Sequence, residues 1–256
     1  MNYTKLGNDI VEWINNYAIN ANMKSLVIGV SGGVDSGLVS TLCARTGLRT
    51  IAVSMPIDQE ANQLKRARNH CHWLDNNFAN VQTFEINLSQ TYDAFKDAIT
   101  YPKDFTTELG LANSKSRIRM VTLYQIASYR NGLVVGTGNK VEDFGVGFYT
   151  KYGDGGVDIS PIADLTKSEV RNLAKELGII DEIVNAVPTD GLWEDNRSDE
   201  DQIGASYEEL EWAMNYDGSY ELTPRRAKVL EIYKKFNTQN KHKMVPIPTF
   251  KKNNEY

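Results

Sequence analysis

The chain has 256 residues, of which 41% are hydrophobic, and its formal net charge at pH 7 is -5. That length and apolar content allow one substantial core, so we expect a single domain over residues 1–256. The acidic balance argues against a nucleic-acid surface, and the apolar runs are too short for a membrane span. The first residues lack the apolar core and cleavage site of a secretory signal, which predicts a cytoplasmic protein.

The chain opens with a predicted amphipathic helix that has Thr4 as its cap, and strands then alternate with helices. Strands separated by helices of this length form a parallel sheet with right-handed crossovers. The sequence therefore predicts an α/β fold, an open parallel, Rossmann-like sheet with helices on both faces. The expected strands are 25–31, 50–55, 81–86 and 132–138, and the expected helices between them are 36–46, 59–78 and 112–130.

The turn Ser31–Ser36 directly follows the first strand and directly precedes a helix. Its two glycines let the backbone turn sharply, and its serine hydroxyls and the helix amides can donate to an anion. The spacing differs from the Gly-rich loops of kinases and dehydrogenases. A carboxylate at Asp35 would repel a phosphate unless a divalent cation lay between them, so the turn predicts a nucleotide with Mg²⁺. A tight turn in which Asp35 caps the next helix is the alternative.

Thr137 lies between two glycines at the end of the strand 132–138. Ligands of open parallel sheets bind at the carboxyl ends of the strands. We therefore expect Ser31 and Thr137 to share one crevice.

Three helices in the second half of the chain are marked by sequence signals at their first residues. The segments 166–169 and 206–209 are typical of capping boxes, and Thr223-Pro224 indicates a cap followed by the first helical position. Between them, the segment 190–202 is polar, acidic and without a capping signal, so we interpret it as a mobile loop.

Three cations and one cysteine each allow two interpretations. Lys167 is expected at the first position of its helix, where a cation opposes the helix dipole, and it is either a solvated lysine or close to a phosphate. Arg117 and Arg119 are either surface charges or a clamp for the phosphates of a dinucleotide. Cys71 has a histidine on each side, but it falls on an apolar helical stripe, which favours a buried thiol over a metal ligand.

Four segments together resemble the successive motifs of ammonia-dependent NAD synthetases, a family of ATP pyrophosphatases. The resemblance covers nearly the whole chain. The first motif is shared by all ATP pyrophosphatases of this fold, whereas the block Phe148–Asp158, followed by Pro161 and Leu165-Thr166-Lys167, is particular to the NAD synthetases. The four segments are Ser31–Ser36, Asn113–Arg119, Gly136-Thr137 with Glu142, and Gly147–Asp158.

The resemblance implies the reaction and its partners. The carboxylate of nicotinic acid adenine dinucleotide would attack the α-phosphorus of ATP, which gives an acyl adenylate and pyrophosphate, and ammonia would then displace AMP to give NAD. It also implies a ligase without a glutaminase domain, a homodimer with the substrate spanning two chains, and a lid formed by residues 190–204.

The resemblance further implies roles for individual residues. Asp35 and Glu142 would bind Mg²⁺, and Asp35, Lys151, Asp158 and Lys167 would be catalytic. The ATP site would contain Gly29, Val30, Ser31, Gly32, Gly33, Val34, Asp35, Ser36, Thr137, Lys167 and Thr189, and the acid substrate would be bound by Arg117, Lys151, Asp158, His242 and Lys243.

Other functions remain open at this point. Another adenylating enzyme with the same turn, such as a guanylate synthetase or a tRNA-thiolating enzyme, is the nearest alternative. The first normally carries an amidotransferase partner region, and the second carries sulfur-handling cysteines and a basic RNA-binding surface. A nucleotide-binding regulator with an inactive site is a third alternative, against which the presence of both Asp35 and Glu142 argues.

Overall fold

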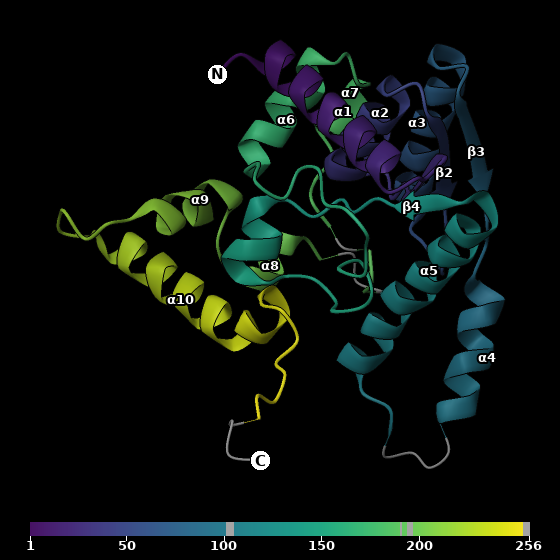
Figure 1. Cartoon of the computed structure of the whole chain (residues 1–256). Coiled ribbons are helices and arrows are strands. Elements are labelled where there is room, and N and C mark those ends of the chain that lie inside the picture. The colour runs from purple at the N-terminus through teal and green to yellow at the C-terminus, as the bar shows by residue number, and fades with distance from the viewer. Residues whose placement is uncertain (101–104, 190, 194–196, 253–256) are drawn as a thin grey trace.

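A four-stranded parallel sheet forms the centre of the computed structural model, which describes residues 1–100, 105–189, 191–193 and 197–252 (Figure 1). The strand order is β3-β2-β1-β4, so β1 pairs with both β2 and β4. The strands β2 and β3 extend the sheet on one side of β1, and β4 lies on the other side. The expected α/β fold is therefore confirmed. The strands are β1 (Ser25–Gly29), β2 (Arg49–Ser54), β3 (Val81–Glu85) and β4 (Gly132–Val134).

Helices cover both faces of the sheet because successive strand side chains point to opposite sides. Leu26 and Ile28 belong to the apolar cluster on one face, whereas Val27 belongs to the cluster on the other. The first face is covered by α1 (Tyr3–Asn20), α2 (Val34–Arg45), α3 (Ala61–Asn77), α6 (Lys167–Glu176) and α7 (Asp181–Val184), and the second by α4 (Ser89–Ile99) and α5 (Glu108–Arg130).

A third group of helices packs around its own apolar cluster, beside the sheet rather than on it. Tyr207 and Leu210 of α9 contribute to this cluster together with Val229 of α10 and Val141 of a π-helix. Figure 1 shows α9 and α10 side by side, on the opposite side of the molecule from α4 and α5. The elements of the group are the π-helix η2 (Val141–Val146), α8 (Asp199–Ile203), α9 (Tyr207–Asn215) and α10 (Pro224–Met244).

The capping signals in the second half of the chain are confirmed. The Thr166 and Ser206 side chains each accept from the backbone amide three residues on, in reciprocal capping boxes, and Thr223 caps α10 with Pro224 at its first position. At the other end of the chain, Asn2 rather than Thr4 caps α1, because the helix begins two residues before the expected point.

The interpretation of residues 190–202 as an uncapped loop is wrong for its last part. Residues Asp199–Ile203 form α8, and Ser198 caps this helix in a capping box with Asp201. The signal is a serine followed three residues later by an aspartate, a shorter acid than the usual glutamate. Residue 190 and residues 194–196, which belong to the same prediction and to the implied lid, lie outside the described residues.

The two cysteines are buried free thiols, and burial raises the pKa of Cys71 to about 12. The interpretation of Cys71 as a core residue is thus confirmed. None of the helices that the structure describes is long and apolar enough to cross a membrane.

Candidate active site

The turn Ser31–Ser36 is closed by its own serine side chains. Ser36 Oγ accepts a hydrogen bond from the Ser31 amide at 3.2 Å and donates to the Gly33 carbonyl at 3.0 Å. Gly33 caps α2 without a side chain, and the helix begins at Val34, so the amides of its first turn and the positive end of its dipole face the mouth of the turn. The local geometry is that of an anion site.

Gly32 gives the turn its shape and lets α3 approach it closely. The φ angle of Gly32 is +86°, a conformation that L side chains rarely adopt. A Cβ at this position would lie 2.6 Å from the Gln63 carbonyl oxygen and 3.0 Å from the Ala67 amide nitrogen, both backbone atoms of α3. The glycine is therefore required both by the backbone angle and by packing.

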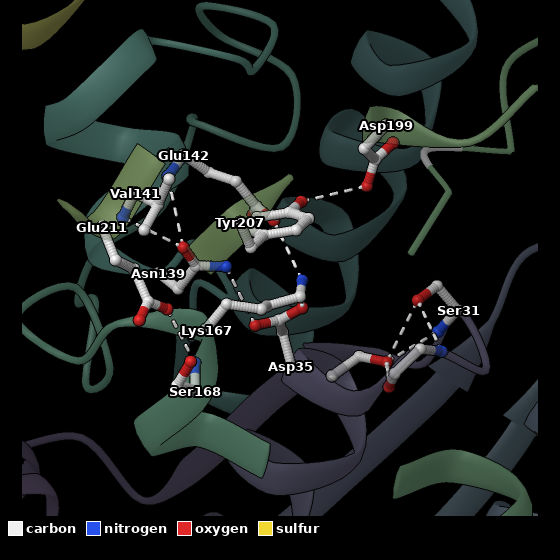
Figure 2. A network of polar contacts seen from close by, with 12 residues as sticks. Ser31, Asp35, Asn139, Val141, Glu142, Lys167, Ser168, Asp199, Tyr207 and Glu211 are labelled. Carbon is white, nitrogen blue, oxygen red and sulfur yellow. Dashed lines mark hydrogen bonds and ion pairs between the residues drawn. The ribbon is translucent and has the colours of Figure 1, made fainter. Parts of the chain in front are cut away.

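Three charged side chains from three different elements meet beside this turn (Figure 2). Lys167, the first residue of α6, is only 3% exposed, and its Nζ lies 2.5 Å from Asp35 Oδ2 and 3.0 Å from Glu142 Oε1. The interpretation of Lys167 as a solvated lysine is therefore wrong. Burial acts to lower the pKa of Lys167, but the two carboxylates raise it, so Lys167 stays charged. Burial raises the pKa of Glu142, and the charge of Lys167 opposes that rise.

Sequence reasoning missed two polar residues that orient these carboxylates. Asn139 Nδ2 donates to Asp35 Oδ1 at 3.1 Å, and Asn139 Oδ1 accepts from the amides of Val141 and Glu142 at the start of the π-helix. The Tyr207 hydroxyl donates to Glu142 Oε1 at 2.6 Å. An asparagine three residues before Glu142 was a readable signal for a cap, whereas nothing near Tyr207 in the sequence points to Glu142.

The donor set fits a divalent cation that is completed by a substrate. Mg²⁺ prefers oxygen ligands and is usually bound by one or two carboxylates together with substrate phosphates. Asp35 and Glu142 supply two such carboxylates, and the Lys167 ammonium shows that positive charge is accommodated between them. Among the described residues, no group of three or more His, Cys, Asp or Glu side chains is placed to hold a metal ion by itself.

A cavity of about 570 Å³ joins these parts. Ser31 and Thr137 both line it, as expected for the carboxyl ends of neighbouring strands, and Arg119 lies in its wall, where it donates to the Met55 carbonyl. Of the residues predicted to bind ATP, those that line the cavity are Gly29, Val30, Ser31, Gly33, Val34, Asp35, Ser36, Thr137, Lys167 and Thr189.

The residues predicted to bind the acid substrate are distributed differently. Among these five described residues, Lys243 alone lines the cavity. The exposed Arg117 donates to the Lys151 carbonyl at 3.4 Å, and Asp158 accepts from the Val134 amide at 2.7 Å and from the Tyr124 hydroxyl at 3.1 Å.

The carboxyl-terminal end of α10 packs against the loop that follows the π-helix of the same chain. Lys243 Nζ donates to the carbonyls of Gly147 and Tyr149, each at 2.8 Å, and Lys151 Nζ donates to the His242 carbonyl at 2.9 Å. Burial lowers the pKa of Lys243. These contacts place the pair His242-Lys243 beside the cavity of its own chain.

Comparisons with known proteins match almost the whole chain. The family model described as NAD synthase matches residues 6–256. An NH(3)-dependent NAD(+) synthetase of Finegoldia magna is 37% identical over 240 residues, which cover 92% of this chain and 95% of that protein. The corresponding enzyme of Carboxydothermus hydrogenoformans is 34% identical over 246 residues, 95% of this chain and 96% of that protein.

Two solved structures match almost the whole chain. The structure of NMN synthetase from Francisella tularensis has a TM-score of 0.87 and 30% sequence identity, and covers 97% of this chain and 98% of that one. The NH3-dependent NAD synthetase from Campylobacter jejuni has a TM-score of 0.79 and 28% identity, and covers 98% of this chain and 100% of that one.

Proposed function

The chain belongs to the NAD synthase family, and on that premise we propose that it amidates nicotinic acid adenine dinucleotide to NAD with ammonia and ATP. The observation that supports this most is the shared cavity. It brings the anion-binding turn, the Asp35 and Glu142 carboxylates and the Lys167 ammonium to one place. Its volume of about 570 Å³ is in the range of small-molecule sites.

The chemistry accounts for the kinds of residue in this cavity. A carboxylate is a poor electrophile, so the substrate carboxylate first attacks the α-phosphorus of ATP, which forms an acyl adenylate and releases pyrophosphate. Ammonia then attacks the acyl carbon and displaces AMP, so no nucleophilic side chain is required. Two anions must be aligned against their repulsion, and the turn amides and Lys167 offset that charge. Mg²⁺ held by Asp35 and Glu142 would supply further positive charge at the phosphates.

The acid substrate would be bound across a homodimer. Arg117, Lys151, Asp158 and His242 lie outside the cavity of their own chain, which is expected if a second chain completes their site. Exposed apolar side chains on α5 support such an interface, since Leu109, Val121 and Tyr129 are 60%, 61% and 77% exposed.

A second candidate substrate is nicotinic acid mononucleotide, whose amidation would give NMN. It is favoured by the match to the NMN synthetase, which has the higher TM-score of the two solved structures described above. Both acids carry the same reacting carboxylate, so the adenylation step would be unchanged. We place the reaction in the cytoplasm, where the two free thiols would remain reduced.

The test is a direct competition between the two acids. The purified protein is incubated with ATP, Mg²⁺, ammonium and either the dinucleotide or the mononucleotide acid, and the amide product and AMP are measured together. Equimolar NAD and AMP from the dinucleotide, with a higher kcat/KM than for the mononucleotide, is the expected result. A preference for the mononucleotide would replace the first candidate by the second, and no AMP with either acid would contradict both.

A further inference from the structure

We propose that Tyr207 is a positioning residue for adenylation, whose hydroxyl orients the Glu142 carboxylate at the cation site and ties it to α8. The inference rests on the proposed function, because a cation site matters only if ATP is activated there. Tyr207 lies 65 residues from Glu142 in the sequence, and the two meet only in the folded chain (Figure 2).

The position of the Tyr207 side chain is fixed from two directions. Tyr207 is the first residue of α9, directly after the capping residue Ser206, and it is fully buried. Further along α9, Glu211 Oε1 accepts a hydrogen bond from the Ser168 amide at 2.9 Å, which joins α9 to the first turn of α6. Because Lys167 precedes Ser168, this contact sets Tyr207 and Lys167 at a constant separation.

Two donors converge on one oxygen of Glu142. The Tyr207 hydroxyl is 2.6 Å from Glu142 Oε1, and Lys167 Nζ is 3.0 Å from the same atom. Two donors on one oxygen fix how the carboxylate is turned in the cavity that it lines. A hydroxyl does this without adding charge, so it holds the carboxylate while leaving its negative charge available to a cation.

The same tyrosine is attached to α8. Its hydroxyl lies 3.2 Å from Asp199 Oδ2, and its backbone amide donates to Glu200 Oε1 at 3.0 Å. A phenol carries a single proton, and the shorter distance assigns that proton to Glu142. Tyr207 thereby connects the Glu142 carboxylate, which lines the cavity, to the first residues of α8.

The ring and the hydroxyl of Tyr207 have separable roles. Lys167 Nζ lies 4.6 Å from the centroid of the ring, a contact that phenylalanine preserves. Tyr207→Phe therefore removes only the hydroxyl. Tyr216→Phe is a matched control, because Tyr216 ends the same helix and its hydroxyl donates to the Tyr220 carbonyl, away from the cavity.

The experiment measures Mg²⁺ binding apart from catalysis. Mg²⁺ is titrated calorimetrically into the protein with α,β-methylene-ATP, an analogue whose α–β bridge cannot be cleaved. We expect Tyr207→Phe to weaken Mg²⁺ binding by about 10-fold, in the range found when a partner of a metal ligand is removed. We expect kcat to fall by a similar factor with the KM of the acid within about 2-fold, and Tyr216→Phe to match the unmodified protein.

A double-mutant cycle separates orientation of Glu142 from a general loss of structure. In a Glu142→Gln background, Tyr207→Phe should cause no further loss of Mg²⁺ affinity, because its hydroxyl then has no carboxylate to orient. The role of Tyr207 would be overturned if Tyr207→Phe bound Mg²⁺ as tightly as the unmodified protein, or if it weakened Mg²⁺ binding equally in the Glu142→Gln background. Either result would leave the proposed function standing. If the unmodified protein bound no Mg²⁺ with the analogue, the metal-dependent function itself would be contradicted.

Discussion

The turn Ser31–Ser36 and the cluster of Asp35, Glu142, Lys167 and Tyr207 lie side by side but are built in opposite ways. The turn is closed by hydrogen bonds between residues no more than five positions apart. The cluster joins α2, the π-helix, α6 and α9, and its contacts span from 25 to 132 residues of sequence. Asp35 belongs to both regions and is the point at which they meet.

The two regions therefore have different roles toward a phosphate group: the turn can bind it, and the cluster sets the charge beside it. The turn offers backbone amides whose geometry is set locally. The cluster holds two carboxylates against one ammonium, a formal charge of -1, so both carboxylates are paired only when all its elements are packed. Loss of Lys167 would leave two carboxylates without their shared cation, whereas a change in the turn acts first on the local backbone.

The largest effect should follow from removing a carboxylate of the cluster. We expect Asp35→Asn and Glu142→Gln each to lower turnover by more than ~10²-fold with the fold retained, as loss of charge stabilisation at the phosphates requires. Steady-state kinetics and circular dichroism measure both parts. Near-normal turnover in either variant would contradict the metal assignment.

Asp143 provides the control for that prediction, since it is adjacent to Glu142 in the π-helix. Burial, and then the Glu142 carboxylate, raise the pKa of Asp143 to about 8. Asp143 does not line the cavity, so an amide of the same shape replaces it without changing a group that faces the ligand. We expect Asp143→Asn to change turnover by less than about 10-fold, well below the effect at its neighbour.

The same contrast explains how much could be read from the sequence. The turn, the parallel sheet and the caps of α6, α9 and α10 follow from short patterns, and all of them are present. The placement of Lys167 between two carboxylates could not be predicted, because the sequence around a lysine at the start of a helix is the same whether its side chain is solvated or buried. The contacts of Tyr207 with Glu142 and of Asn139 with Asp35 were missed for the same reason, since both are set by tertiary packing and not by spacing.

A substitution within the turn should have the next largest effect. Gly32→Ala meets both an unfavourable φ of +86° and two backbone atoms of α3, and we expect a loss of about 3 kcal/mol in the free energy of unfolding, with weaker ATP binding. Gly47→Ala is the control, because its φ is +76° but a Cβ there meets nothing within 4 Å. Urea unfolding of both variants separates strain from the clash, and equal losses would show that packing of α3 on the turn is unimportant.

The packing of α3 on α2, beside the turn, should make the free energy of unfolding depend on pH. His70 of α3 is buried against Ser40 of α2, with 2.8 Å between Nε2 and Oγ, and burial lowers the pKa of His70 to about 4. Between the unfolded pKa of 6.5 and the folded value, the unfolded chain binds more protons, so the free energy of unfolding falls as the pH falls. We expect this histidine to contribute a loss of about 2 kcal/mol between pH 8 and pH 5.

Urea unfolding at a series of pH values tests this contribution. His70→Gln should remove about 2 kcal/mol of the pH dependence above pH 5, whatever its absolute stability. The exposed His72 lies on the same helix, and His72→Gln should leave the dependence unchanged. The same slope in both variants would mean that His70 does not titrate in the unfolded chain as proposed.

The smallest effect should come from the cap that presents Lys167 to the cluster. Thr166→Ala removes the acceptor of the Glu169 amide at the start of α6 and should lower the free energy of unfolding by about 1 kcal/mol. Thr223→Ala removes a matching cap from α10 and should have a similar stability cost. The two variants should differ in function, because only Thr166 precedes a residue of the cluster: its loss should raise the KM for ATP by about 3-fold, a fraction of the 1 kcal/mol cap energy, while Thr223→Ala leaves it unchanged. If both substitutions raised the KM for ATP alike, the effect would come from the lower stability of the whole protein. The position of Lys167 in the cluster would then not depend on the cap of α6 in particular.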